Sequence, residues 1–232
     1  MDFASMWSVF YDQMFTYNGY KKVLDGLLAT AEIAVFGLLI GIVIGTVLAI
    51  AKVVPKYHVF PRICSGIAGV YIAIFRGTPM VVQLLIGYFV LMPALGISAQ
   101  PLGVAILIFG LNSGAYVSEI MRSGINSVDR GQLEAGRAVG LSYSVSMFKI
   151  VIPQAIKNIL PTLGNEFIVL VKETSVASFI AVTDLTKAFR DIADATYEYI
   201  IPYLTLAAVY LIMVLIITLL IKLMERRLAR SD

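Results

Sequence analysis

The stretch Glu134–Pro153 reads EAGRAVGLSYSVSMFKIVIP and separates two long apolar segments. Gly136 and Gly140 are four residues apart in a run that is otherwise compatible with a helix, and residues at this spacing share one helix face. Each glycine costs a helix about 1 kcal/mol relative to alanine, but a face without side chains lets another backbone come close. We therefore predict a docking helix here. The alternative is an amphipathic connector in which the glycines have no role.

The composition is that of an integral membrane protein. Hydrophobic residues make up 59% of the 232 residues and charged residues 14%, whereas a soluble domain has about 45–50% apolar and about 25% charged residues. The net charge of +3 is small and the basic residues lie beside apolar segments, so we expect no nucleic-acid partner. The only histidine, His58, has no second ligand at metal spacing, so we expect no metal site.

Five segments are long enough to cross a bilayer core of about 30 Å. They are residues 24–51, 61–92, 102–120, 153–182 and 200–220. Basic residues follow the first and last of these segments, and the positive-inside rule places such residues in the cytoplasm. We expect one all-α membrane domain over residues 1–232, with the N-terminus outside, the C-terminus inside and a cytoplasmic loop over 122–149. An aromatic interfacial helix is expected over 1–22 and an amphipathic helix over 183–198.

Residues 76–79, Arg-Gly-Thr-Pro, interrupt the second segment. Pro79 cannot continue the helical hydrogen bonds, so we predict a break here with Arg76 at depth. A buried arginine in a membrane is costly and usually faces a cavity or a partner. The alternative is that Arg76 snorkels to the surface and a shorter helix begins after Pro79.

Polar residues mark the third and fourth segments. Asn112 and Ser113 can bind solute or join helices, and Glu119 and Arg122 have the spacing of an intrahelical pair. The fourth segment is too polar to face lipid, so it must face an interface or a water-filled pathway. Its residues 172–175, Lys-Glu-Thr-Ser, suit a zwitterionic ligand. A Lys–Glu pair that satisfies other groups of the bundle is the alternative.

Several motifs together resemble one family of transporters. The spacing Glu-Ala, four residues, Gly140, nine residues, Ile150, two residues, Pro153 is similar to the cytoplasmic coupling loop of ATP-binding-cassette (ABC) importer permeases. The motifs Arg-Gly-Thr-Pro at 76–79, Asn112–Glu119, Gly-Asn-Glu-Phe-Ile at 164–168 and Lys-Glu at 172–173 resemble the branch that carries polar amino acids of the histidine, glutamate, glutamine and arginine group. Gly136 stands where the family usually has alanine, which loosens the local helix.

The resemblance implies a type I importer permease with five transmembrane helices in a bacterial cell membrane. Glu134, Ala135, Gly136, Gly140 and Ile150 would belong to the ATPase-coupling segment, and Pro153 would orient the fourth helix. The implied partners are two ATPase subunits that hold ATP and Mg²⁺, a second permease copy or paralogue, an extracytoplasmic solute-binding protein and a polar amino acid.

Candidate pathway residues follow from polarity and depth. They are Arg76, Thr78, Asn112, Ser113, Glu173 and Thr174.

The chain carries neither a Gly-x-x-x-x-Gly-Lys-Ser/Thr phosphate loop nor a catalytic constellation. We therefore expect it to be no enzyme and to hold no cofactor, with ATP hydrolysed by a separate subunit. A proton-coupled secondary transporter, with Glu119, Glu166 or Glu173 carrying protons, is the competing class. A structural membrane subunit is the third. The amino acid carried and the choice between homodimer and heterodimer stay open.

Overall fold

The computed structural model describes residues 3–55 and 57–228, and all the regular secondary structure in these ranges is helical, as predicted. Residues 1–2, 56 and 229–232 of the predicted domain lie outside the described ranges. Four described helices are long and apolar enough to cross a membrane: α2 (Gly19–Val53), α3 (Val59–Gly77), α6 (Pro101–Asn126) and α11 (Ile200–Leu228). The other helices are α1 (Phe3–Tyr11), α4 (Met80–Ile86), α5 (Met92–Ala94), α7 (Arg130–Ala138), α8 (Tyr143–Ser146), α9 (Ile152–Glu173) and α10 (Leu185–Thr196).

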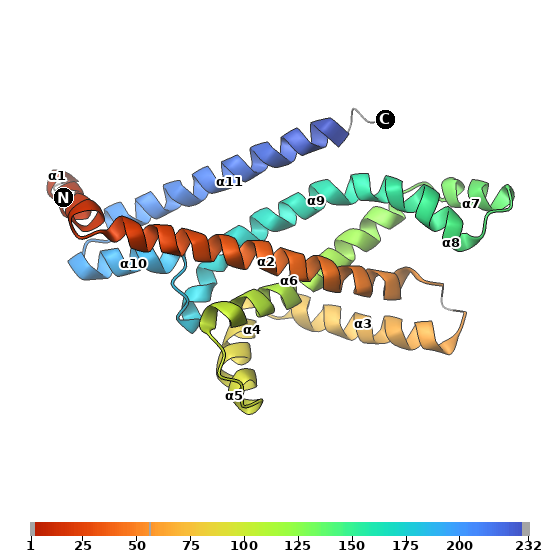
Figure 1. The fold of residues 1–232 in the computed structure, drawn as a ribbon, viewed down its shortest axis with the longest axis horizontal. Coiled ribbons are helices and arrows are strands. Elements are labelled where there is room, and N and C mark those ends of the chain that lie inside the picture. The colour runs from red at the N-terminus through yellow and green to blue at the C-terminus, as the bar shows by residue number, and fades with distance from the viewer. Residues whose placement is uncertain (1–2, 56, 229–232) are drawn as a thin grey trace.

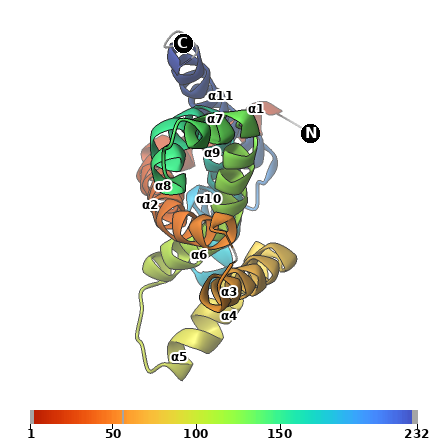
Figure 2. The same ribbon diagram turned by 90° about the vertical axis from the view of Figure 1, so that its right-hand side faces the viewer.

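The helices form an elongated bundle. Figure 1 shows α1 and α10 at one end of the molecule and α7 and α8 at the other. Viewed along the bundle, α2, α6 and α9 form a central group, with α11 on one side and α3 to α5 on the opposite side (Figure 2).

A ridge of glycines brings α2 against α6. Gly37, Gly41 and Gly45 are buried, and a Cβ atom added to them would lie 3.1, 2.5 and 2.7 Å from atoms of Phe109, Ser113 and Val117. The contact is reciprocal, because Gly110 and Gly114 of α6 receive Ile40 and Ile44 of α2. The spacing of four residues in the first apolar segment thus marks a helix–helix contact, as membrane helices use it.

The break predicted in the second apolar segment is confirmed. Helix α3 ends at Gly77, Thr78 and Pro79 are extended with ψ angles of 145° and 142°, and α4 begins at Met80. The predicted range 61–92 is therefore two helical pieces, and the second piece turns away from α2 as an arm that continues into α5 (Figure 1).

The predicted range 153–182 is also composite. Helix α9 ends at Glu173, and a 3₁₀ helix over Thr174–Ile180 follows. Helix α9 is not among the apolar candidates, which agrees with the polar character expected of this segment.

The amphipathic helix predicted over 183–198 is confirmed as α10. Its apolar residues Leu185, Ala188, Phe189 and Ile192 are buried, and the helix packs against α2 and α11. The carboxylate of Asp184 caps the helix by accepting hydrogen bonds from the backbone N–H groups of the next turn. Burial raises the pKa of Asp184, and these hydrogen bonds oppose the rise.

The glycine ridge predicts a sharp contrast between two alanine substitutions. In Gly45→Ala the new Cβ would lie 2.7 Å from Val117 Cγ1 and 2.9 Å from the backbone nitrogen of Ser118, so the helices must move apart. We expect a loss of about 1–3 kcal/mol, seen as a lower unfolding temperature of the purified protein in detergent. Gly66→Ala on α3 is the control, because nothing lies within 4 Å of its Cβ position. Equal unfolding temperatures for the two variants would contradict the ridge.

Candidate functional site

The segment predicted to couple to an ATPase folds as α7, a turn and α8. The side chain of Asp129 caps α7 by accepting a hydrogen bond from the backbone N–H of Gly131 at 2.7 Å. At the other end, Gly140 has a φ of +89°. The N–H of Leu141 donates to the carbonyl of Gly136 at 3.1 Å, and the N–H of Gly140 donates to the carbonyl of Arg137 at 3.0 Å. This pair of bonds is the Schellman motif, in which glycine ends a helix.

The prediction that Gly136 and Gly140 share a helix face is therefore wrong. Gly140 lies beyond the end of α7, where its positive φ is required for the turn. Gly136 is in the helix, but it is buried against the chain itself: a Cβ there would lie 2.8 Å from both Ile150 Cδ1 and Ser146 Oγ. The contact between Gly136 and Ile150 thus packs α7 against the segment that follows α8. Glu134 and Ala135 are exposed and available to a partner.

Side-chain amides connect α7 to the bundle. Gln154 Nε2 donates to Gln132 Oε1 at 3.3 Å, which joins the first turn of α9 to α7. Asn158 Nδ2 donates to Ser127 Oγ at 2.9 Å, which joins α9 to the end of α6. Pro153 is the second residue of α9, but the chain before it is already helical, because α8, a π-helix over Met147–Val151 and α9 follow one another directly. The two hydrogen bonds thus join α7 to α9 and α9 to the end of α6.

The break between α3 and α4 is held by two amides. Gln83 Nε2 donates to the carbonyls of Phe75 and Thr78 at 2.8 and 3.0 Å and contacts Thr78 Oγ1 at 2.9 Å. Asn112 Nδ2 donates to Gln83 Oε1 at 3.0 Å and to the Phe75 carbonyl at 3.3 Å. These bonds satisfy carbonyl groups that the break would leave without partners. For Asn112 the structure thus favours the joining role over solute binding, and Thr78 takes part in the same network.

Ser113 is buried and packs against Gly41 of α2. Its hydroxyl lies 3.5 Å from Glu166 Oε1 of α9, and Glu166 is 9% exposed. Within residues 3–55 and 57–228 no ion pair is found for Glu166. A buried carboxylate with a hydroxyl as its neighbour is a polar contact between α6 and α9, away from the open surface.

The residues Lys172 to Ser175 do not converge on one ligand site. Thr174 is fully buried and donates its hydroxyl to the Val171 carbonyl at 2.8 Å. Lys172 and Ser175 line a shallow groove of about 310 Å³ beside α10 and α11, whereas Glu173 is not among the residues of that groove. The described part of the chain has no Lys172–Glu173 ion pair either. Within the described chain these residues form neither a shared groove nor a Lys172–Glu173 pair, and the role of Glu173 and Thr174 toward a substrate stays a prediction.

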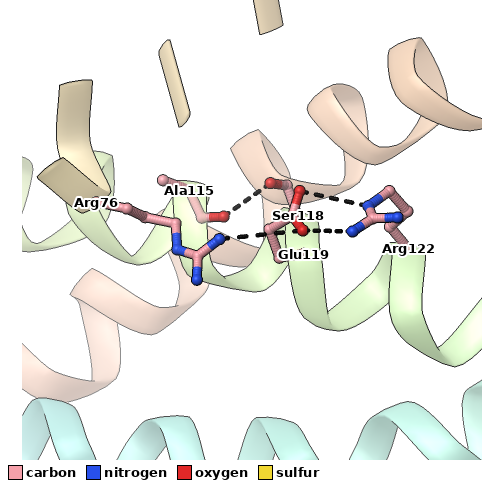
Figure 3. Close-up of polar contacts among 5 residues, drawn as sticks. All are labelled: Arg76, Ala115, Ser118, Glu119 and Arg122. Atoms are coloured by element: carbon pink, nitrogen blue, oxygen red, sulfur yellow. Dashed lines mark hydrogen bonds and ion pairs between the residues drawn. The ribbon is translucent and has the colours of Figure 1, made fainter. Parts of the chain in front are cut away.

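Arg76 lines a cavity and its side chain is 45% exposed, while its depth in a membrane stays a prediction. The cavity has a volume of about 730 Å³ and is walled by Arg76 of α3, by Tyr116, Glu119 and Arg122 of α6, and by Asn158 and Thr162 of α9. Figure 3 shows Glu119 between the two arginines. Arg122 Nη2 donates to Glu119 Oε2 at 2.7 Å, which confirms the predicted intrahelical pair. Arg76 Nη1 lies 4.0 Å from the same oxygen.

The cavity combines charged, aromatic and amide groups. The guanidinium carbon of Arg76 lies 5.3 Å from the centre of the Tyr116 ring, within the range of a cation–π contact. Tyr116, Asn158 and Thr162 were not predicted as site residues. Asn158 and Thr162 are four apart in a polar helix and so share a face, which is a usable signal. Nothing in the sequence indicates that this face meets Arg76. The arrangement can hold a small polar molecule that bears a carboxylate.

The chain belongs to the binding-protein-dependent transport system inner membrane component family. The family model matches residues 37–230, a range that contains the cavity, the break and α7. Membership agrees with the apolar helices of the described structure and with the coupling-loop resemblance.

Relatives of this chain are permease proteins. It is 40% identical over 210 residues to the arginine transport system permease protein ArtQ of Bacillus subtilis, covering 90% of this chain and 94% of the relative. It is 38% identical over 217 residues to the putative glutamine transport system permease protein GlnP of Rickettsia prowazekii, covering 92% and 97%. A chain in the crystal structure of an amino acid ABC transporter with histidines is 38% identical, with a TM-score of 0.84 over 93% of this chain and 97% of that one.

The amide network at the break predicts the effect of Gln83→Met. Methionine keeps the length of the side chain but removes the hydrogen bonds to the Phe75 and Thr78 carbonyls, and it leaves Asn112 with the Phe75 carbonyl as its remaining partner. We expect a loss of about 1–3 kcal/mol, measured as a lower unfolding temperature in detergent. Gln100→Met is the matched control, because Gln100 is exposed. An unchanged unfolding temperature for Gln83→Met would show that the network does not hold the break.

Proposed function

We propose that the chain is the transmembrane subunit of an ATP-driven importer of polar amino acids. The similarity to permease proteins of arginine and glutamine transport systems, over nine-tenths of the chain, carries the proposal. The cavity between α3, α6 and α9 supports it, because it offers arginine donors for the carboxylate of an amino acid and amide and hydroxyl oxygens for the ammonium. ATP and Mg²⁺ belong to two separate ATPase subunits, and this chain performs no chemistry of its own.

The proposed topology has five crossings, with the N-terminus outside and the C-terminus in the cytoplasm of a bacterial cell. Helices α2, α6, α9 and α11 are four crossings, and α3 with the arm after the break is the fifth. The distribution of charge supports this orientation. Basic residues without adjacent acids gather where α2 ends and α3 begins, which is the same end of the molecule as α7 (Figure 1). At the opposite end, α10 carries Asp191 and Asp194 beside its basic residues.

In the proposed mechanism, α7 receives motion from the ATPase. The exposed Glu134 and Ala135 would lie in the ATPase surface, while Gly136, Gly140, Ile150 and Pro153 would fix the shape of the segment behind them. The Gln132–Gln154 and Ser127–Asn158 hydrogen bonds would carry the motion to α6 and α9. Because these helices wall the cavity, their displacement would open it to alternate sides of the membrane. A second permease copy or paralogue completes the pathway, and a solute-binding protein delivers the amino acid.

A proton-coupled secondary transporter is the second candidate. The observation in its favour is Glu166, a buried carboxylate that contacts Ser113 between α6 and α9. A proton-coupled carrier has no ATPase subunit that would bind the exposed helix α7. We therefore prefer the ATP-driven mechanism. A structural membrane subunit, the third class, would leave its partner's ATPase unaffected by any solute.

The test of coupling is Ala135→Trp. Ala135 is exposed on α7, so the larger side chain fits the isolated chain but obstructs a partner docked there. We expect the ATPase subunit to be lost on co-purification, and substrate-stimulated ATP hydrolysis in proteoliposomes to fall at least about tenfold, the effect of a loss of about 1.4 kcal/mol.

Ala195→Trp is the control, because Ala195 is exposed on α10 at the opposite end of the molecule. It should retain the ATPase subunit on co-purification. Normal co-purification and stimulation in Ala135→Trp, with an unchanged unfolding temperature, would contradict the role of α7.

A further inference from the structure

We infer that Arg76 binds the carboxylate of the substrate and makes the cavity selective for neutral and acidic amino acids over cationic ones. The inference rests on the proposed function, since it concerns the substrate of the same cavity. It adds the charge class of the substrate, which the relatives leave open because their names include both arginine and glutamine.

The first argument is that Glu119 is already occupied. Arg122 donates to both of its carboxylate oxygens, from Nη2 at 2.7 Å and from Nε at 3.4 Å. Arg122 is three residues away on the same helix, so this pair persists without any contribution from α3. Glu119 is therefore a neutralised group rather than an open site for a cationic side chain.

The second argument is that Arg76 retains its donors. Its approach to Glu119 is 4.0 Å, beyond hydrogen-bond distance, and in the described ranges no hydrogen bond from its guanidinium is found. The Tyr116 ring positions the guanidinium from one side without using its N–H groups. A planar fork of free N–H donors matches a carboxylate in a bidentate manner. The α-carboxylate of an amino acid is the group that this fork is suited to bind.

The third argument is the charge of the cavity as a whole. Arg76 and Arg122 contribute two positive charges and Glu119 one negative charge, while Asn158 and Thr162 on the α9 side are neutral. A bound carboxylate brings the sum to zero, and the substrate ammonium can then face the amide oxygen of Asn158, whose nitrogen is bonded to Ser127. A cationic side chain would add a positive charge near Arg122, and the acidic group in the described walls, Glu119, is already paired with Arg122. Repulsion between like charges at close range therefore disfavours a cationic substrate.

The experiment measures equilibrium binding to the assembled permease–ATPase complex without the solute-binding protein. The probes are radiolabelled L-glutamate, L-glutamine and L-arginine. We expect glutamate and glutamine to bind at least about tenfold more tightly than arginine. Arg76→Gln should weaken the binding of glutamate and glutamine by about ten- to a hundredfold, the effect of losing a hydrogen bond to a charged group. It should also reduce or reverse the difference in affinity between these two amino acids and arginine. Arg76→Lys should keep the preference against arginine while binding glutamate less tightly.

Arg62→Gln is the matched control, since Arg62 is an exposed arginine of α3 that does not line the cavity. It should leave all three affinities unchanged. Arginine binding to the unsubstituted complex as tightly as glutamine would overturn the inference. An equal loss of affinity for all three amino acids in Arg76→Gln would also overturn it. So would a failure of all three to bind to the unsubstituted complex. The proposed function is tested separately, by measuring ATP-driven uptake of amino acids with the binding protein present. If uptake is seen but arginine binds as tightly as glutamine, the inference about Arg76 is wrong and the proposed function is not.

Discussion

The structure depends on the close approach of α2 and α6. Where Gly37, Gly41 and Gly45 face Phe109, Ser113 and Val117, the two helices meet with little more than backbone on the α2 side. Lipid tails are as apolar as leucine, so packing of this kind, rather than exclusion from water, holds membrane helices together. The contact fixes the rotation of α6 about its axis. It therefore decides that Asn112 meets the break after α3 and that Glu119 and Arg122 face the cavity.

A second constraint acts on every polar group in such a bundle, because hydrocarbon offers no partner for an open carbonyl or charge. The break after α3 meets this constraint with Gln83 and Asn112, and Ser113 meets it with Glu166. Arg76 is the exception, since its guanidinium is left without a hydrogen bond in the described ranges while it faces an open cavity. An unsatisfied fork of donors is tolerable there only if water or a solute reaches it, which connects the packing of the bundle to transport.

Much of the fold could be predicted from spacing alone. The glycine ridge of α2, the break at Pro79, the buried face of α10 and the Glu119–Arg122 pair are local patterns, and the structure has each of them. The site could be predicted only in part. In a sequence, a glycine that ends a helix cannot be distinguished from a glycine that lies within a helix and exposes its backbone. The prediction for Gly140 is wrong for this reason. The meeting of Arg76 with Asn158 and Thr162 is set by tertiary packing. Lys172 and Thr174 are two residues apart and lie in different surroundings, because a helix turns about 100° per residue.

The energy source of transport tests the account most directly. The measurement is amino acid uptake by proteoliposomes that contain the permease, its ATPase and its binding protein, with ATP or a non-hydrolysable analogue enclosed and with the proton gradient either imposed or abolished by an ionophore. The account predicts uptake that requires hydrolysable ATP and is indifferent to the ionophore. Uptake that continues without ATP and stops when the gradient is abolished would contradict it and would make Glu166 the residue to study.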